Sequence, residues 1–219
     1  MKDDPKTKPA PGDPDPSGPA RRARFTAADS EQAGAIVCVA WLSLPAAHRE
    51  VLETLGASQS QVVNEPLGLA VNGFLKSAGL SELDRATRVR TDRALAVWIP
   101  DIRLVLIDLG HAEFEGLDRP TFERVIARLA WHEWGHALSI DRCSAEDVAA
   151  GRRLLELAPE GVRENIRAAE YRPSQYTHEV VAEIYAMLIG RRRRDEVGRP
   201  QWLNDEIYTL VMRVTGWTP

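Results

Sequence analysis

The stretch Trp131-His132-Glu133-Trp134-Gly135-His136-Ala137 places two imidazoles four residues apart and a carboxylate directly after the first. Residues at i and i+4 of a helix lie one turn apart on the same face, so both rings can reach a single ion from one rigid support. An apolar periodicity that begins after Pro120 runs into this stretch, which predicts that a helix carries it. The sequence therefore predicts a metal site on a partly buried helix.

The residue types in this stretch select the metal and its chemistry. They form the HExxH pattern, in which two histidines hold zinc and the glutamate acts as general base toward a water that the metal activates. His132 and His136 are thus the predicted zinc ligands and Glu133 the predicted base. The alternative is a core helix with two satisfied histidines, since the pattern also occurs by chance. Gly135 costs about 1 kcal/mol relative to Ala in a helix, which indicates that it makes room for a neighbouring backbone.

A catalytic zinc site usually has a third protein ligand and one open position. Glu179 and Glu183 lie four residues apart on a helix predicted from Thr177 to about Arg193. Glu179 is the predicted third ligand, and Glu183 the predicted carboxylate that orients a ligand histidine through its other ring nitrogen. The swapped assignment of the two glutamates stays open. His178 is a weaker alternative, because it points about 100° away from Glu179 on a helix.

Composition restricts the partners and the compartment. A net charge of −4 over 219 residues leaves no basic footprint for nucleic acid, and the four arginines at 191–194 are typical of a solvated helix end. No apolar stretch reaches the 18 or so residues of a membrane span. Two cysteines cannot form a disulfide framework, and Cys38 is expected to be a small buried hydrophobe. We expect a cytoplasmic protein, with non-classical secretion left open, that acts on a protein or peptide in an undetermined oligomeric state.

The chain divides into a tail and one domain. Residues 1–24 are rich in proline and charge and poor in apolar residues, which predicts a disordered tail before a domain at 25–219. Two branched runs at 94–99 and 102–107 flank Pro100-Asp101, which predicts a β-hairpin directly before the metal helix. The expected fold is α+β and mostly helical, with this hairpin or a small sheet beside the metal helix. Other helices are expected at 28–44, from Pro45 to about Leu55, at 60–78 (bent or begun at Pro66), at 145–157 and at 160–170.

These motifs together resemble those of the gluzincins, the zinc metallopeptidases that combine HExxH with a glutamate ligand. The similarity is closest to the catalytic domain of anthrax lethal factor and the Pro-Pro endopeptidases. Residues 132–136 match the HExGH of that group, and residues 179–183 match its EFFAE-type helix, with valine at both aromatic positions. Residues 202–207 resemble the start of its last helix, so the resemblance covers roughly 94–214. It implies a zincin-like domain and a zinc-dependent endopeptidase, in which a strand before the metal helix can pair with extended substrate. A hairpin that only packs on the helix is the alternative.

The resemblance also implies a tyrosine that donates to the developing oxyanion. Tyr171 and Tyr176 are the candidates, with Tyr171 slightly ahead, but neither falls at the expected spacing, and a packed tyrosine is the alternative for each. This departure keeps two other functions open. One is a zinc-stabilised regulatory or interaction protein with little protease activity, and the other is a cytoplasmic regulatory protease specific for one repressor-like partner.

Overall fold

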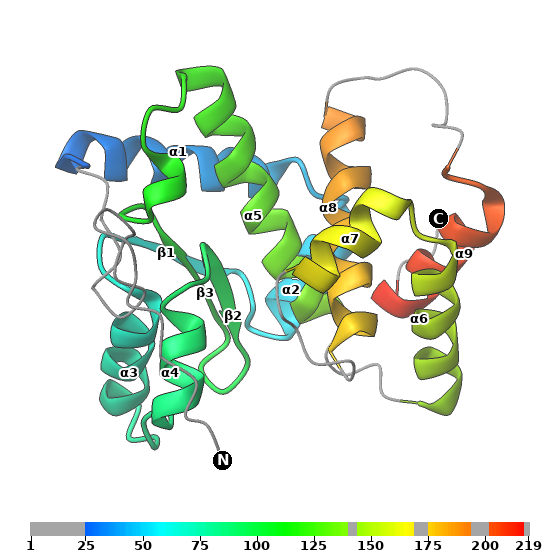
Figure 1. Ribbon diagram of the computed structural model, residues 1–219, viewed down its shortest axis with the longest axis horizontal. Coiled ribbons are helices and arrows are strands. Elements are labelled where there is room, and N and C mark those ends of the chain that lie inside the picture. Colours follow the sequence, from blue (N-terminus) through cyan, green and yellow to red (C-terminus); the bar gives the residue numbers. More distant parts are fainter. Residues whose placement is uncertain (1–24, 140–143, 169–174, 194–201, 217–219) are drawn as a thin grey trace, which may run out of the picture.

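The computed structural model describes residues 25–139, 144–168, 175–193 and 202–216. Helices dominate this part of the chain, and three strands form one small mixed sheet (Figure 1). The expected α+β, mostly helical class is therefore confirmed. The predicted tail at 1–24 lies outside the described residues.

The sheet lies on one side of the central helix and has the strand order β1-β3-β2. β2 (Ala96–Ile99) and β3 (Leu104–Asp108) pair antiparallel, which confirms the predicted hairpin, and β1 (Gln59–Val63) adds to β3 in parallel. β3 is buried along its whole length, as expected for a strand that is paired on both edges. β2 is consequently an edge strand of the sheet.

The helix predicted at 60–78 is wrong in its first part and right in the rest. Residues 59–63 form β1 because the branched Val62 and Val63 gain backbone partners on β3, a strand about 40 residues further along the chain. The helix itself, α3 (Leu67–Ser77), begins directly after Pro66. Proline lacks an N–H, and its fixed φ suits the residue before a first helical turn.

The N-terminal helices pack over the sheet and the central helix. α1 (Ala27–Leu42) ends before Pro45, which starts α2 (Ala46–Thr54) as predicted. Cys38 is exposed rather than buried, because α1 is apolar on most sides and its other face enters the core. No single helix in the described residues could cross a membrane by length and hydropathy, and α1 with α2 passes that test only as a pair bent by 111°.

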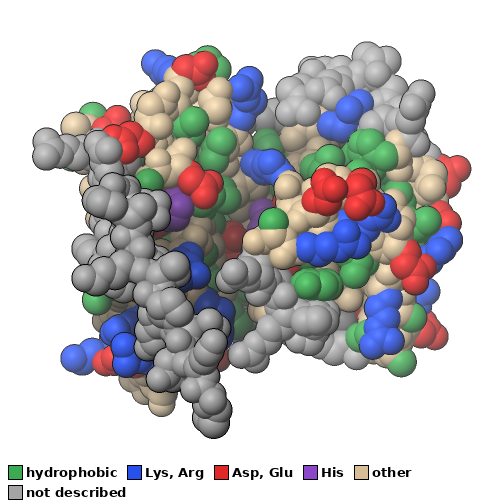
Figure 2. All heavy atoms as spheres, viewed as in Figure 1, with side chains coloured by type: hydrophobic (Ala, Val, Ile, Leu, Met, Phe, Trp, Pro, Cys, Tyr) green, Lys and Arg blue, Asp and Glu red, His purple; other side chains and the backbone are tan. Residues whose placement is uncertain are grey.

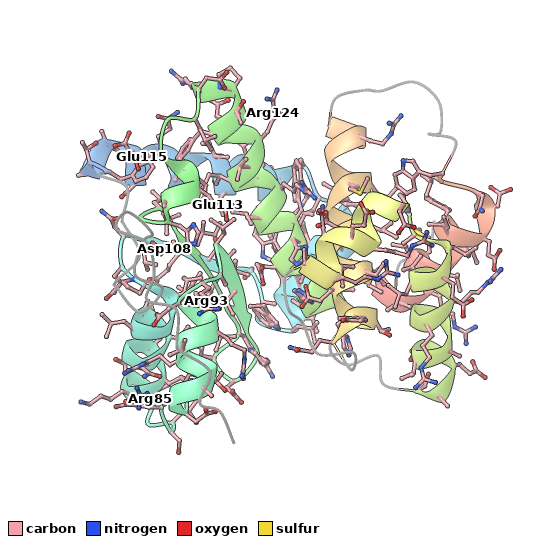
Figure 3. The ribbon with its side chains drawn as sticks, viewed as in Figure 1. Arg85, Arg93, Asp108, Glu113, Glu115 and Arg124 are labelled. Carbon is pink, nitrogen blue, oxygen red and sulfur yellow. The ribbon has the colours of Figure 1, made fainter. Side chains whose placement is uncertain are left out.

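Two short helices lie around the hairpin. α4 (Arg85–Thr91) comes before β2 and was not predicted, and its first turn is capped by the carboxylate of Asp84. The 3-10 helix η1 (Ala112–Phe114) follows β3. Figure 3 labels Arg85 and Arg93 near α4, and Asp108, Glu113 and Glu115 near the carboxyl end of β3.

The C-terminal half is built entirely from helices in the described residues. Asp118 caps the central helix α5 by accepting from the Thr121 N–H at 2.7 Å, as the predicted start around Pro120 requires. The helices predicted near 145–157, 160–170 and 177–193 are confirmed to within two residues over the described part. They are α6 (Ala145–Leu157), α7 (Glu160–Ala168) and α8 (Tyr176–Arg193), which lie between α5 (Arg119–Ser139) and α9 (Asp205–Thr215) in the chain.

α5 joins the two halves of the molecule. On one side it is anchored to α1, where the Trp131 indole N–H donates to the Ala40 carbonyl at 3.0 Å and the Trp134 ring meets Trp41 edge-on at 5.1 Å. On the other side α8 packs along it, and α8 also contributes to a second apolar cluster with α6, α7 and α9. The two histidines of α5 therefore lie between the N-terminal and C-terminal halves of the molecule, on a helix that packs against α1 on one side and α8 on the other.

Candidate metal centre

α5 and α8 approach each other very closely beside the histidines. A Cβ placed on Gly135 would lie 2.9 Å from the Ala182 Cα and 3.2 Å from the Tyr185 ring. Contacts of that length are shorter than van der Waals packing permits. Gly135 thus makes room for a neighbouring backbone, as its place in the sequence predicts, and the two helices can bring short side chains together.

A second glycine sets α8 against α6. A Cβ on Gly151 would lie 1.9 Å from the Thr177 Cγ2, in the first turn of α8. No side chain larger than hydrogen fits at 151 while Thr177 keeps this position. The start of α8, where Glu179 lies, is therefore held by a close fit on α6 as well as on α5.

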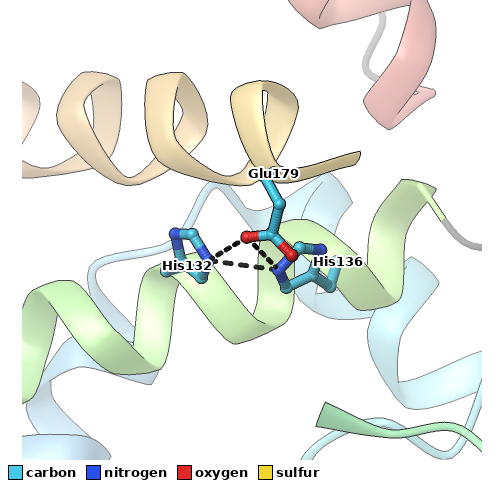
Figure 4. A group of neighbouring side chains, drawn as sticks. All are labelled: His132, His136 and Glu179. Carbon is cyan, nitrogen blue, oxygen red and sulfur yellow. Dashed lines mark hydrogen bonds and ion pairs between the residues drawn. The ribbon is translucent and has the colours of Figure 1, made fainter. Parts of the chain in front are cut away.

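Figure 4 shows the result, in which the carboxylate of Glu179 reaches from α8 to both imidazoles of α5. Glu179 Oε2 lies 3.4 Å from His132 Nε2 and 3.5 Å from His136 Nε2, and the two ring nitrogens are 3.1 Å apart. Among the described residues these three side chains form the group that could hold a metal ion. The structure thus brings together His132, His136 and Glu179, the three residues predicted as ligands.

The three donor atoms have the spacing that zinc requires. Zinc binds imidazole nitrogen and carboxylate oxygen at about 2.0–2.1 Å in tetrahedral geometry, which puts neighbouring ligand atoms about 3.3 Å apart. The observed separations of 3.1, 3.4 and 3.5 Å are close to the edges of that tetrahedron. Nitrogen-rich donors also disfavour calcium and magnesium, which select oxygen ligands. The residues present could therefore hold a metal ion, and their donor atoms are compatible with zinc.

The carboxylate of Glu179 and the imidazole of His132 stabilise each other's charged forms. Glu179 Oε2 is buried, and its nearest partners in the described residues are the two imidazole nitrogens at the long distances of 3.4 and 3.5 Å, an arrangement that a bound cation would stabilise. Burial raises the pKa of Glu179, but hydrogen bonding and charge from the two histidines lower it to about 2. Burial likewise lowers the pKa of His132, and the carboxylates of Glu179 and Glu183 overcome this and raise it to about 10. Without an ion, the protonated His132 is thus the counter-charge of the ionised Glu179, and a metal cation that replaced this proton would take over that role.

Glu183 lies on the other side of His132. Its Oε2 is 3.4 Å from His132 Nδ1, the ring nitrogen that faces away from the ligand cluster. Its Oε1 forms an ion pair with the guanidinium of Arg128. Glu183 is therefore placed to orient the ring, the role predicted for it, while Glu179 is placed at the ligand position.

Glu133 lies beside the cluster and outside the ligand set. Its side chain is buried, and its carboxylate lies near the backbone of Trp98 on β2. Burial raises the pKa of Glu133 above its ordinary value, and the nearby His136 and His132 counteract this in part. A carboxylate whose pKa is shifted upward, toward neutral pH, is suited to act as a general base.

The remaining candidates from the sequence are not in the cluster. Tyr176 packs as a half-buried side chain in the apolar cluster of α6, α7, α8 and α9, and Tyr171 lies outside the described residues. His178 is exposed on the first turn of α8 and does not join the ligand group. Of these, Tyr176 has the position of a packed tyrosine, the alternative weighed from the sequence.

The centre is reachable from solvent. The side chains of His132 and His136 are 17% and 18% exposed, and Figure 2 shows histidine surface in the hollow at the middle of the molecule. A groove of about 870 Å³ between α5, α7 and α8 is lined by Arg128 and Glu183, but not by His132, Glu133, His136 or Glu179. The partial exposure of the two imidazoles, rather than this groove, is what gives solvent access to the cluster.

Sequence reasoning missed two polar contacts. Arg128 could have been found, since it lies one helical turn before His132 on the same face of α5. The buried contact of His48 Nδ1 with the Tyr185 hydroxyl, 2.8 Å long, joins α2 to α8 behind Gly135, and no local pattern signals it because the two residues are 137 positions apart.

The three ligand atoms, the buried base and the oriented imidazole characterise this centre. No protein-family model, curated protein or solved structure matches the chain. Geometry and donor chemistry are therefore the grounds for assigning a function.

Proposed function

We propose that the protein is a zinc-dependent endopeptidase with a zincin-like domain of the gluzincin class. One observation carries the proposal: three ligand atoms 3.1–3.5 Å apart from two helices, next to a buried glutamate that does not ligate. That combination is the one that metal-assisted hydrolysis needs, because a metal and a base must act on the same water.

The residues divide the work of hydrolysis between them. Zinc, when bound by His132, His136 and Glu179, supplies a Lewis acid that polarises the scissile carbonyl and acidifies a nearby water. Glu133 accepts the proton of that water and passes it to the departing amine. Trp98 of β2 lies near the Glu133 carboxylate. The ligand side chains and the base all belong to the two packed helices α5 and α8.

The edge strand β2 offers a place for an extended peptide. Asp108 N–H donates to the Leu95 carbonyl at 2.9 Å, so in this register Val97 and Ile99 also face β3. Ala96 and Trp98 therefore direct their backbone groups outward, on a strand that packs against α5. A substrate that pairs with this edge would lie alongside the base and the ligands irrespective of its side chains.

Two measurements test the proposal in sequence. Elemental analysis of the purified protein should give about one zinc per chain, and Glu179→Ala should lose most of it. A peptide library should then be cleaved by the zinc-loaded protein and left intact by Glu133→Gln, which should still hold zinc. Absence of zinc after metal is supplied, or cleavage by Glu133→Gln at the wild-type rate, would refute the proposal.

A second function has one observation in its favour. Tyr176 and Tyr208 pack in an apolar cluster and the Tyr185 hydroxyl contacts His48, so no tyrosine in the described residues is placed to donate to an oxyanion. A zinc-stabilised interaction protein would need no such donor, and it would retain library peptides without cutting them. A regulatory protease specific for one repressor-like partner would leave the library uncut and cleave that partner alone.

A further inference from the structure

Basic and acidic side chains alternate across the contact between α5 and α8. Arg128, His132 and His136 follow one another at intervals of one turn on α5, and Glu183 and Glu179 do the same on α8. Glu183 lies between Arg128 and His132, and Glu179 lies between His132 and His136. We call these five residues the α5–α8 ladder. Its outer end is an arginine that no part of the proposed hydrolysis uses.

The carboxylate of Glu183 bridges its two neighbours through different oxygens. Oε1 pairs with Arg128, and Oε2 faces His132 Nδ1 at 3.4 Å. Both contacts can therefore exist together, and the first fixes the plane in which the second oxygen lies. An arginine is suited to this task because its guanidinium is planar and always charged.

We propose that Arg128 is a positioning residue for the metal ligand His132 and acts through Glu183. The inference rests on the proposed zinc site. A ligand histidine must keep its proton on the ring nitrogen that faces away from the metal, and a carboxylate at that nitrogen fixes both the tautomer and the ring plane. Arg128 holds that carboxylate at the Nδ1 side of His132, so that Nε2 is the nitrogen presented to the ion.

The location of Arg128 makes this role testable. Its side chain is 53% exposed and lines the groove between α5, α7 and α8, so its replacement uncovers no core. Arg124 lies one turn earlier in the same groove, where its guanidinium donates to the Thr121 hydroxyl at 2.8 Å (Figure 3). Arg124→Met is thus a matched control that removes the same charge from the same helix.

The experiment measures zinc affinity by competition with a chromophoric chelator, in the wild type and in four variants. Glu183→Gln should weaken zinc binding about 10- to 100-fold, the usual effect of losing the partner of a ligand histidine. Arg128→Met should weaken it about 3- to 10-fold, Arg128→Lys should recover most of that loss, and Arg124→Met should leave it unchanged. In the Glu183→Gln background Arg128→Met should have no further effect, because the two residues act in series. Thermal unfolding of each metal-free variant checks that the fold is kept.

The possible failures are distinguishable. An Arg128→Met effect that is the same in both backgrounds, or no larger than that of Arg124→Met, overturns the role of Arg128 and leaves the zinc site standing. A wild-type protein that binds no zinc overturns the zinc site and this inference together.

Discussion

Gly135 of α5 faces the backbone of Ala182 of α8 so closely that a Cβ on the glycine would lie 2.9 Å from the Ala182 Cα. The obstruction is backbone, so it cannot be relieved by a rotamer change. The separation of the two helices, and with it the distance from Glu179 to the histidines, therefore depends on the missing side chain at 135.

Gly135→Ala should consequently separate the helices and loosen the metal site. We expect a loss of about 1–3 kcal/mol in the free energy of unfolding, as for other overpacked cores, and a clear fall in zinc affinity. Urea unfolding and zinc competition measure the two effects. Gly34→Ala is the matched control, since nothing lies within 4 Å of its added Cβ on α1, and it should stabilise slightly through helix propensity. Equal behaviour of the two variants would contradict the close contact.

Metal removal should lower the stability of the whole fold. A ligand that binds only the native state adds a free energy that grows with its concentration, about 4 kcal/mol at a thousand times the dissociation constant. The melting temperature should therefore rise on addition of zinc and fall on addition of a chelator. Glu179→Ala should respond to neither, and a zinc-dependent shift that survives in this variant would place the ion elsewhere.

The metal-free protein should be most stable in mildly acidic solution. The pKa of His132 is raised in the fold from 6.5 to about 10, so its contribution to stability is complete below pH 6.5 and is lost as the pH rises toward 10. The pKa of Glu179 is lowered from 4.5 to about 2, so its contribution is complete above pH 4.5 and is lost as the pH falls toward 2. Melting temperatures of the chelator-treated protein should thus be highest between these limits. A melting temperature that does not change with pH would show that the charges of His132 and Glu179 do not interact.

Zinc and the proton should compete for His132. Zinc needs the neutral imidazole, so its apparent affinity should rise up to about tenfold per pH unit between about pH 6 and 8. Titration calorimetry in buffers of different ionisation enthalpy should report about one proton released per zinc at neutral pH. Release of no proton would contradict the raised pKa of His132.

Tyr185→Phe should test the buried contact between α2 and α8. The variant keeps the ring that packs on Gly135 but removes the hydroxyl that meets His48 Nδ1 at 2.8 Å. We expect a loss of about 1–3 kcal/mol in the free energy of unfolding, because a buried polar group loses its partner, while zinc affinity stays unchanged. Loss of zinc binding at constant stability would instead make Tyr185 part of the metal centre.

Local patterns in the sequence were enough to predict most of the helices and the hairpin. α5 and α8 carry long apolar periodicities bounded by start signals, and β2 and β3 are branched runs on either side of a Pro-Asp turn. β1 escaped prediction because its partner β3 lies about 40 residues away, and Val62 and Val63 fit a helical period equally well. α4 escaped because its arginines form no apolar stripe and its cap at Asp84 is the only signal.

The candidate site was predictable where one helix supplies its residues. His132, Glu133 and His136 share a single turn of α5, so their spacing alone indicates a common ion. Glu179 required the inference that a later helix returns to the same place, and the contact of Gly135 with α8 is what permits it. The proposed role of Arg128 on α5 depends on Glu183 of α8, which in turn faces His132 of α5. The spacing of residues within one segment cannot reveal a relation that passes through a second helix.

The alternation of charge between α5 and α8 has a consequence for alignment. Both helices repeat their polar residues at one-turn intervals, so a slide of α8 by about 5.4 Å would again set carboxylates against bases. Charge attraction alone would therefore tolerate two alignments, of which only one places Glu179 between the histidines. The notches at Gly135 and Gly151 accept the Ala182 backbone and the Thr177 side chain at a single position. Steric fit, rather than ion pairing, thus decides which glutamate lies between the two histidines.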